Sequence, residues 1–457
     1  MKYKTKNIFV IIACAAAVLL AVGMILYGAS LHENEKSAVV LGTPSHTTIT
    51  LTDGTATPAP TPTPITYTEM TLLSIGDLMY HMPQVNAARI PGTEQYDFTD
   101  NFRYIKEIVS AADYAVANFE TTLSEKEYSG FPNFRSPYAV LDSIQDAGFD
   151  MLLFANNHCY DTGLDGILRT LGKFEEYGFD YIGARKDPEE NFYLLKEING
   201  IRIGFLNYTN DIAYGSGRLD SINGIHIRSG DLPYMDLYND GLLDAFYAEA
   251  EKRITALRTE GAEMIVFYIH WGEEYQLTPN SRQTAVAQKL CDLGVDVIIG
   301  SHPHVIQPME LLTSSADPEH QTICFYSMGN FISNQNRLTL TSTENKEWTE
   351  NGLMVELTIR KYSDGAILIT NIAYIPTWVH RYYPSGSSSM KYQVVPLPAA
   401  CAAPEDYGLT ASDFGVSHAQ AAFQMTDHVF CDIVEVFNQS VVLPYEDDAV
   451  IALPKAS

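Results

Sequence analysis

The chain has 457 residues, of which 46% are hydrophobic, so it has the size and composition of one large or two ordinary folded domains. Its 56 acidic against 29 basic residues give a formal net charge of -27. This balance excludes a nucleic-acid-binding surface, because neutralising phosphates requires clustered lysine and arginine. Divalent cations or cationic partners suit it better, although an acidic surface more often serves solubility alone.

The N-terminus is predicted to be a membrane anchor. Three lysines precede the uncharged apolar run 8–27, which is long enough to cross a bilayer as a helix. The basic residues would stay in the cytoplasm, so the rest of the chain would lie on the extracytoplasmic side of the cell membrane. A cleaved signal peptide is the alternative, since small residues follow at 28–30, but the apolar run exceeds the usual core of such a peptide.

A proline-rich segment follows the predicted anchor. In TATPAPTPTP, residues 55–64, proline alternates with threonine and alanine, which favours an extended spacer. We therefore expect four parts: a cytoplasmic start with a transmembrane anchor, an extracellular Thr/Pro-rich linker, one large domain and a C-terminal extension. Their expected bounds are 1–30, 31–68, 69–395 and 396–457.

From residue 70 onward, strand-like and helix-like segments alternate, which is typical of an α/β fold. Near residue 350 the pattern changes to two alternating runs joined by Asp364-Gly365, which predicts a β-hairpin. In the C-terminal extension we expect a helix around 418–430 and assign no chemistry to its histidines. The predicted strands cover 70–77, 113–120, 149–158, 179–183, 201–208, 263–275, 295–305, 322–331, 352–360 and 366–376.

Polar side chains follow nearly every predicted strand of the first 335 residues. Taken singly, each has an ordinary explanation, such as a turn, a helix cap or a histidine satisfied in the core. If the strands are parallel, however, all of these side chains converge on one edge, where ligands bind in α/β sheets. They are Asp77, Glu120, Asn157, His158, His270, His302, His304 and Asn330.

This set of side chains favours a metal site. Oxygen and nitrogen donors without thiolates suit a divalent first-row metal such as Mn, Fe or Zn in an open site. His302 and His304 flank one proline, so their imidazoles can reach two metals on either side of a turn. Two ions about 4 Å apart need a bridging carboxylate, for which Glu120 or Asp77 is available. The sequence therefore predicts a site for divalent metal, with side chains that could hold two ions.

Six ordered motifs carry a family resemblance. GDLM, NFE, NNHCYDTG, HWGEEY, GSHPHVIQP and SMGNF, between residues 70 and 335, resemble the CapA (PgsA-like) family of poly-γ-glutamate capsule synthesis proteins. The domain of that family is similar to calcineurin-type metallophosphoesterases. The resemblance implies a four-layer α/β/β/α sandwich with a dinuclear metal site at the strand ends. It also implies an anchored, outward-facing protein of a bacterial cell envelope.

The resemblance also assigns roles by position. The first metal would be held by Asp77 and His304, with Glu120 as the bridge to the second. Asn157, His270 and His302 would hold the second metal. His158 would be the imidazole that protonates a leaving oxygen without binding metal. The remaining candidates would support the ligands or line the substrate cleft: Asn156, Asp161, Glu274 and Asn330.

Two positions depart from the metallophosphoesterase pattern. Those enzymes usually carry histidine two residues after the first aspartate, where this chain has Met79. The first metal then lacks a ligand unless His81 or another group replaces it. Glu120 stands where the bridging residue is usually aspartate, which lengthens the bridge by one methylene. Both departures put ordinary phosphoesterase activity in doubt.

Three functions compete at this point. The first is a metal-dependent hydrolase or transferase that acts on an anionic envelope polymer such as poly-γ-glutamate, with His158 as the acid. The second is a non-catalytic, metal-binding subunit of a polymer synthesis or export complex, with membrane synthetase subunits as partners. The third is an extracytoplasmic phosphoesterase. The sequence does not rank them, because a metal pair stabilises phosphoryl and acyl transition states alike.

Overall fold

The computed structural model describes residues 64–210, 218–410, 415–441, 443–445, 450–453 and 455. Within this part of the chain, no helix is both long enough and apolar enough to span a bilayer. The anchor predicted at 8–27 lies outside the described residues, and so does most of the predicted linker.

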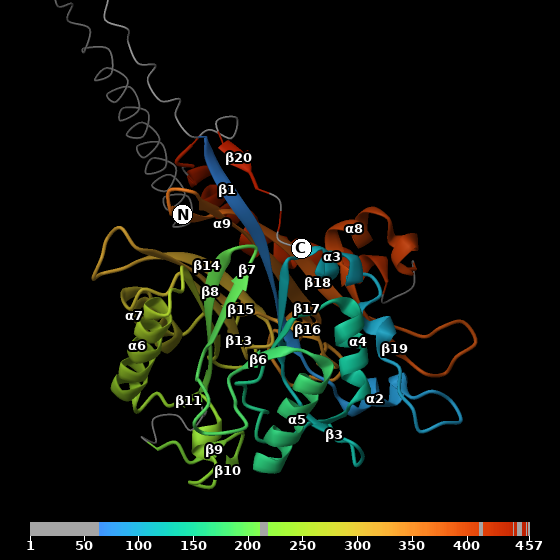
Figure 1. Cartoon of the computed structure of the whole chain (residues 1–457). Coiled ribbons are helices and arrows are strands. Elements are labelled where there is room, and N and C mark those ends of the chain that lie inside the picture. The colour runs from blue at the N-terminus through green and yellow to red at the C-terminus, as the bar shows by residue number, and fades with distance from the viewer. Residues whose placement is uncertain are drawn as a thin grey trace, which may run out of the picture. The chain divides into compact units, whose positions relative to one another are not determined.

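Two β-sheets form the centre of the described molecule (Figure 1). In the first sheet, β1, β2, β5 and β6 are parallel, whereas β17, β18 and β19 continue the sheet with antiparallel pairing on the other side of β1. The short strands β16 and β20 also pair in parallel with β1. The bounds are β1 (Ile65–Leu78), β2 (Tyr114–Phe119), β5 (Met151–Leu153), β6 (Asp180–Ile182), β16 (Asn330–Ile332), β17 (Asn351–Tyr362), β18 (Ile367–Tyr382), β19 (Lys391–Pro396) and β20 (Val450–Ala452).

The second sheet has the order β11-β8-β12-β13-β15-β14, and β7 pairs with β8. Its strands are parallel except β7 and β14, which are antiparallel to their neighbours. The bounds are β7 (Leu194–Ile198), β8 (Ile201–Asn210), β11 (Leu237–Tyr238), β12 (Met264–His270), β13 (Val297–Ser301), β14 (Ile306–Thr313) and β15 (Gln321–Met328).

The helices and two small strand pairs lie outside these sheets. Strand β3 (Thr122–Ser124) pairs with β4 (Arg135–Pro137), and β9 (Ser221–Ile222) pairs with β10 (Ile225–His226) in a hairpin. The α-helices are α2 (Met82–Ala88), α3 (Lys106–Ala111), α4 (Ala139–Ala147), α5 (Gly163–Tyr177), α6 (Leu243–Thr259), α7 (Ser281–Asp292), α8 (Leu397–Ala402) and α9 (Val416–Ser440). Short 3₁₀ helices cover Thr99–Phe102, Leu232–Tyr234, Lys346–Glu350 and Pro404–Tyr407.

Alternating side chains place the two sheets face to face. Along β12, Val266 and Tyr268 enter a buried core that also contains Leu72 of β1 and Val116 of β2. Phe267, between them in sequence, packs on the other side with α6 and α7. Successive strand residues point to opposite faces, so each sheet has one face against the other sheet and one face against helices. With α4 and α5 on the first sheet, this is the expected α/β/β/α layering.

The second half of the chain agrees with the sequence analysis in two further ways. Strands β17 and β18 form the antiparallel hairpin predicted around Asp364-Gly365. The predicted C-terminal helix is present as α9 but is longer, because its buried stripe continues past residue 430. Phe430 of α9 enters the core between the sheets, with its ring 6.3 Å from that of Phe325.

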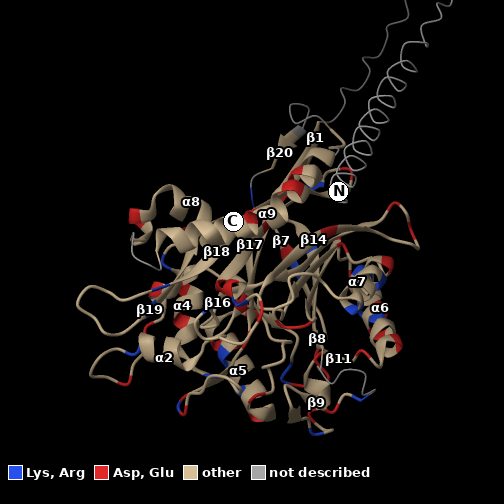
Figure 2. Ribbon diagram, turned by 180° about the vertical axis from the view of Figure 1, so that it is seen from behind, with Lys and Arg blue, Asp and Glu red and all other residues tan. Residues whose placement is uncertain are grey.

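Charged residues are spread over the described molecule. Asp and Glu occur on helices and loops of both outer layers, and Lys and Arg lie among them (Figure 2). The excess of acidic residues therefore does not mark one face as a binding surface, and it is consistent with a solvated exterior.

Candidate functional site

The site begins with a bulge in β1. Residues Met70, Leu72 and Ser74 face the second sheet, and the register of β1 then shifts between Ile75 and Asp77. The shift turns the side chain of Asp77 toward the second sheet as well. Gly76 permits it, because a Cβ atom at this position would lie 1.9 Å from the carbonyl oxygen of Gly329. The Gly-Asp pair is therefore needed for the direction of Asp77.

Strand alternation places the next side chains at the same edge. Asn118 and Glu120 follow Val116 at intervals of two residues, and His270 follows Tyr268 in the same way. Each of these polar side chains therefore continues an inward-facing row at the carboxyl end of its strand. All three are almost fully buried.

The two histidines of the turn after β13 have different nearest partners. His302 and His304 have φ angles of 97° and 56°, in the left-handed region that residues other than glycine rarely adopt. His302 Nδ1 lies 3.1 Å from His270 Nε2, while His304 Nδ1 lies 3.0 Å from Asp77 Oδ2. The two imidazoles therefore contact different side chains, although both lie near Glu120.

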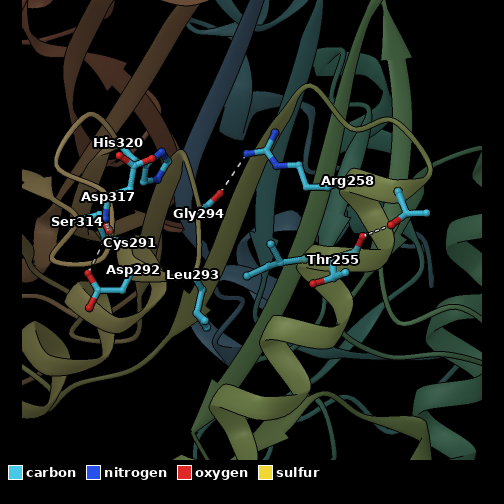
Figure 3. Close-up of a pocket in the computed structure, with 11 residues that line it drawn as sticks. Thr255, Arg258, Cys291, Asp292, Leu293, Gly294, Ser314, Asp317 and His320 are labelled. Carbon is cyan, nitrogen blue, oxygen red and sulfur yellow. Dashed lines mark hydrogen bonds between the residues drawn. The ribbon is translucent and has the colours of Figure 1, made fainter.

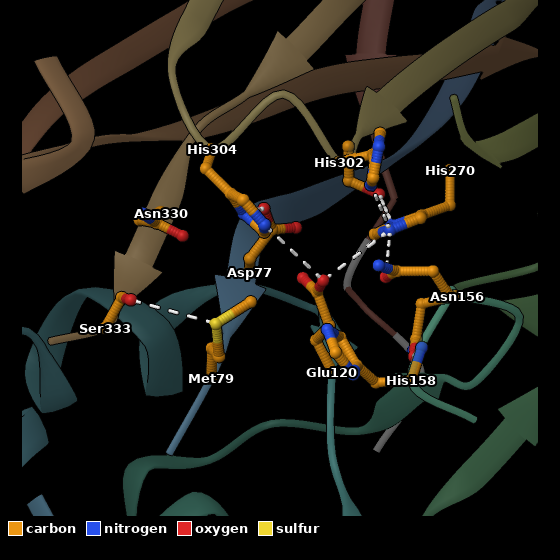
Figure 4. Close-up of polar contacts among 12 residues, drawn as sticks. Asp77, Met79, Glu120, Asn156, His158, His270, His302, His304, Asn330 and Ser333 are labelled. Atoms are coloured by element: carbon orange, nitrogen blue, oxygen red, sulfur yellow. Dashed lines mark hydrogen bonds and ion pairs between the residues drawn. The ribbon is translucent and has the colours of Figure 1, made fainter. Parts of the chain in front are cut away.

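Two overlapping groups of donors could each hold a metal ion. Asp77, Glu120 and His270 form one group, and Glu120 forms the other with His302 and His304. Within each group the candidate ligand atoms lie within 4.8 Å of one another. Figure 4 shows Glu120 between His304 and His270. Its Oε1 atom is 3.6 Å from His270 Nε2 and 3.8 Å from His304 Nε2, so Glu120 is the shared member.

Glu120 is buried without a partner for its charge. Its exposed fraction is 0%, and neither carboxylate oxygen has a hydrogen-bond partner within the described part of the chain. Burial, followed by the charge of Asp77, raises the pKa of Glu120 well above its usual value. A buried polar group without a partner is costly, whereas a divalent cation would satisfy both oxygens. The residues present therefore fit a metal ion.

The neighbouring imidazoles are suited to the same ligand. Burial, followed by the charges of neighbouring histidines, lowers the pKa of His270 well below 6.5 and that of His302 to about 4. Burial also acts to lower the pKa of His304, but its hydrogen bond to Asp77 and the charge of Asp77 outweigh this and raise it. Neutral imidazole is the form that binds metal. Asn157 Oδ1 completes the cluster at 2.9 Å from His270 Nε2.

His158 belongs to a different arrangement beside these groups. Its Nδ1 atom lies 2.8 Å from Asp161 Oδ2, and the Asp161 side chain is fully buried. The same carboxylate oxygen accepts a hydrogen bond from the backbone N–H of Phe134 at 2.5 Å. His158 lies outside both groups of candidate ligands. An imidazole that is oriented by an aspartate beside candidate metal ligands is suited to proton transfer.

The other predicted residues occupy varied positions. Asn156 shapes the turn, since its side chain donates to Phe119 O and accepts from the N–H of His158. Asn330 donates to Gln335 Oε1 and to Thr349 O, while its own Oδ1 is buried without a partner among the described residues. Glu274 is exposed, on a segment tied to the histidine turn by the hydrogen bond from Tyr275 N to Pro303 O at 2.8 Å.

The position of the missing ligand remains apolar. Met79 is buried, with its sulfur 3.9 Å from Ser333 Oγ. His81 does not join either group of candidate ligands: its Nδ1 accepts from the N–H of Asn334 at 3.3 Å, and its ring packs on Phe134. The side chain of His81 is therefore engaged elsewhere.

Two polar residues of the site were missed in the sequence. Asn118 donates to Asp77 Oδ1 at 2.8 Å and lies 3.4 Å from His270 Nδ1, so it contacts two members of the same group of candidate ligands. Ser301 Oγ lies 2.9 Å from His270 Nδ1 and fixes that ring. The NFE motif could have revealed Asn118, because it stands two residues before Glu120 on the same face of the strand. Ser301 has no such signal.

A pocket elsewhere on the molecule is separate from the candidate metal ligands. It has a volume of about 600 Å³ and lies between α6 and α7 and the segment after β14 (Figure 3). Arg258 is its cationic side chain, but the guanidinium already binds Asp296 Oδ2 at 2.7 Å and Gly294 O at 3.1 Å. The candidate ligands are not among its lining residues. We assign no ligand to this pocket.

Comparison with known proteins places the chain in a family. The family model described as bacterial capsule synthesis protein PGA_cap matches residues 71–335, which is more than half of the chain. The chain belongs to this family. The matched region contains every candidate metal ligand, from Asp77 to His304.

Two capsule proteins of this type are similar to the chain. The PGA biosynthesis protein CapA of Bacillus subtilis (strain 168) is 29% identical over 289 residues, which are 61% of this chain and 66% of that protein. The capsule biosynthesis protein CapA of Bacillus anthracis is 29% identical over 280 residues, which are 58% of this chain and 60% of that protein. The match therefore spans less than two thirds of either relative.

A solved structure shows a weaker likeness. The calcineurin-like phosphoesterase YfkN from Bacillus subtilis covers 79% of this chain and 97% of its own chain, with 13% sequence identity and a TM-score of 0.37. A superposition at this level carries no argument about the site, which depends on the side chains described above.

Proposed function

We propose that this member of the PGA_cap family is a membrane-anchored, metal-dependent hydrolase or transferase that acts on an anionic envelope polymer such as poly-γ-glutamate. The polymer would be handled during its synthesis, export or attachment to the cell. One observation supports this most strongly: buried Glu120, whose oxygens lack partners, stands between two groups of metal-binding side chains at the ends of the strands. The names of the two CapA relatives support a capsule polymer as the substrate.

In this proposal the residues of the site have different roles. Asp77 and His304 would hold one divalent ion, Asn157, His270 and His302 a second, and Glu120 would bridge them; Mn, Fe and Zn all suit these donors. Bound metal would supply Lewis acidity toward a phosphoryl or carbonyl oxygen. Asp161 holds His158 through Nδ1. The second ring nitrogen of His158, Nε2, would take up a proton from solvent and deliver it to the departing oxygen or nitrogen of the substrate.

A second candidate is a non-catalytic subunit that binds metal or polymer without turnover. Buried Met79 favours it, because this position holds no donor and His81 is engaged with Asn334. The first metal would then have fewer protein ligands than the second. In this case the partners would be membrane synthetase subunits, and the site would serve assembly. A plain extracytoplasmic phosphoesterase is the third candidate.

The roles of two neighbouring residues separate these candidates. Asn157→Ala should lower metal occupancy, because it removes a ligand. His158→Ala should leave the metals bound and lower turnover by about 100- to 10,000-fold, the usual contribution of a positioned general acid. Metal analysis and thermal melting of both variants, with a cell-based polymer assay, measure this. Equal metal content in the two variants would contradict the division of roles, and unchanged polymer production in His158→Ala would favour the non-catalytic subunit.

The proposed location has its own test. If residues 8–27 anchor the chain with its N-terminus in the cytoplasm, protease added to intact cells should degrade the folded domain. The anchor and the cytoplasmic residues should survive, as detected with a tag at the N-terminus. A domain that is cut only after lysis would contradict an extracytoplasmic location.

A further inference from the structure

The tip of a small hairpin reaches the His158 pair from a distant part of the chain. Strands β9 and β10 are joined by Asn223-Gly224, whose φ angles of 48° and 74° are those of a tight hairpin turn. Ile222 and Ile227 on either side are buried in the same core as Cys159, the neighbour of His158. The hairpin is therefore fixed against the segment that carries His158.

The side-chain amide of Asn223 contacts three groups at once. Its Nδ2 atom lies 3.2 Å from Asp161 Oδ1, 3.1 Å from Pro132 O and 3.2 Å from His158 Nδ1. The first two groups can only accept, so they take the two hydrogens of the amide. This orientation is fixed, because turning the amide by 180° would place its oxygen against the carboxylate of Asp161.

These contacts also settle where the proton of His158 lies. Asp161 Oδ2, at 2.8 Å, is the acceptor for Nδ1 of the ring, since Asn223 Nδ2 can only donate. Nδ1 therefore carries a hydrogen, and Nε2 is the nitrogen left for the substrate. To act as a proton donor, Nε2 must first take up a proton from solvent, which makes the ring an imidazolium whose Nδ1–H stays on Asp161. Together with Phe134 N, three N–H groups converge on the two oxygens of Asp161.

We infer that Asn223 is a positioning residue for His158. It orients the carboxylate of Asp161 and ties it to the 125–135 segment through Pro132 O, and it thereby holds His158 in the Nδ1–H tautomer. This role rests on the proposed function of His158 as the proton donor. Nothing in the spacing of the sequence motifs connects Asn223 with them, because the hairpin lies 65 residues beyond His158.

The chain offers a matched control for a test. Asn199 occupies the same kind of Asn-Gly turn, between β7 and β8, with a φ angle of 50°, and donates to Glu69 O. Glycine accepts this backbone conformation, so Asn223→Gly and Asn199→Gly each remove an amide without straining the turn. Asn223→Asp keeps the size of the side chain but faces Asp161 with a second carboxylate.

The experiment uses the full-length chain labelled with ¹⁵N-histidine and reconstituted with Mn or Zn. Ring-nitrogen NMR of the Zn form reports the tautomer of His158, and the His158→Ala variant identifies its signals. Hydrolysis of bis(p-nitrophenyl) phosphate measures turnover in the Mn or the Zn form. Asn223→Gly should mix the tautomers of His158 and lower kcat by about tenfold, with KM and metal content unchanged. Asn223→Asp should lower kcat further, and Asn199→Gly should match the wild type.

Ring-nitrogen shifts of His158 that are the same in Asn223→Gly and in the wild type would overturn the inference. This outcome is separate from failure of the proposed function. If the wild type leaves the phosphodiester intact while its tautomer still depends on Asn223, then the positioning role stands and the catalytic role of His158 falls.

Discussion

Glu120, in the first half of the chain, and Glu350, in the second half, are equally buried, yet their surroundings differ completely. Glu120 is 0% exposed and Glu350 is 1% exposed. Glu350 accepts hydrogen bonds from Arg337 Nε at 3.0 Å, from Arg381 Nη2 at 3.1 Å and from Trp378 Nε1 at 3.2 Å. Glu120 has the imidazoles of His270 and His304 and the carboxylate of Asp77 around it, and neither of its oxygens accepts a hydrogen bond within the described part of the chain. The protein supplies the counter-charge of Glu350 itself, whereas Glu120 is left for a cation from solution.

The largest effect should follow from breaking the Glu350 cluster. Glu350→Ala leaves Arg337 and Arg381 without their counter-charge, and removal of one partner from a buried ion pair usually costs about 3–5 kcal/mol. We expect the lower end of this range, because the Arg337 side chain is 24% exposed. Urea unfolding of the metal-free chain measures the loss, and metal binding should be unchanged. Reduced metal affinity in this variant would contradict the claim that Glu350 acts on stability alone.

Substitution of Glu120 should instead affect metal binding and leave the stability of the metal-free chain intact. A metal at 100 times its dissociation constant stabilises a folded protein by about 2.7 kcal/mol if the unfolded chain does not bind it. We expect this gain for the wild type on addition of Mn or Zn, its loss with EDTA, and no gain for Glu120→Gln. Without metal, Glu120→Gln should be as stable as the wild type or more so, because it removes a buried carboxyl group whose oxygens have no hydrogen-bond partner among the described residues. Thermal melting with and without metal decides it, and an equal metal response in the two proteins would refute the bridging role.

The smallest effect, counted per pH unit, is the pH dependence of stability that comes from His380 beside Arg381. Burial, followed by the charge of Arg381, lowers the pKa of His380 from 6.5 to about 4. Between these values the unfolded chain binds more protons than the folded one, so stability falls as the pH drops from 6.5 to 4. One group contributes at most about 1.4 kcal/mol per pH unit. His380→Phe, which keeps the ring between Trp378 and Tyr382, should reduce this slope by up to that amount, with and without metal. Parallel slopes in the two proteins would show that His380 is protonated in the folded state.

Local sequence patterns predicted much of the fold. Apolar runs and their alternation located the parallel strands, and the polar residue at each strand end located Asp77, Glu120 and His270 correctly at one edge. Alternation also explains why Glu120 and His270 face each other across the two sheets. These features depend on strand geometry, which repeats every two residues and can be read without knowing the partners of each strand.

Other features depend on contacts between distant residues. The bulge at Gly76 exists because Gly329 approaches it, and the sequence does not reveal that approach. Asn223 reaches His158 from a hairpin whose sequence has no recognisable link with the motifs of the site. Its contact is set by the burial of Ile222 and Ile227, which only the packed structure shows. His81 looked like a replacement ligand because of its position in sequence, but its backbone partner Asn334 holds the ring elsewhere.

The distance in sequence between Asp77 and His304, which lie 3.0 Å apart, has a consequence for biosynthesis. The two residues are 227 positions apart. At the usual 5–20 residues per second, a ribosome needs about 10 to 45 s to add the second after the first. From residue 157 onward in that interval, the nascent chain contains Asp77, Glu120 and Asn157 but lacks the turn that carries His302 and His304. A chain that stops before residue 302 can therefore form part of the first sheet but lacks one of the two groups of candidate ligands, so a metal ion held by both groups would mark chains that extend past His304.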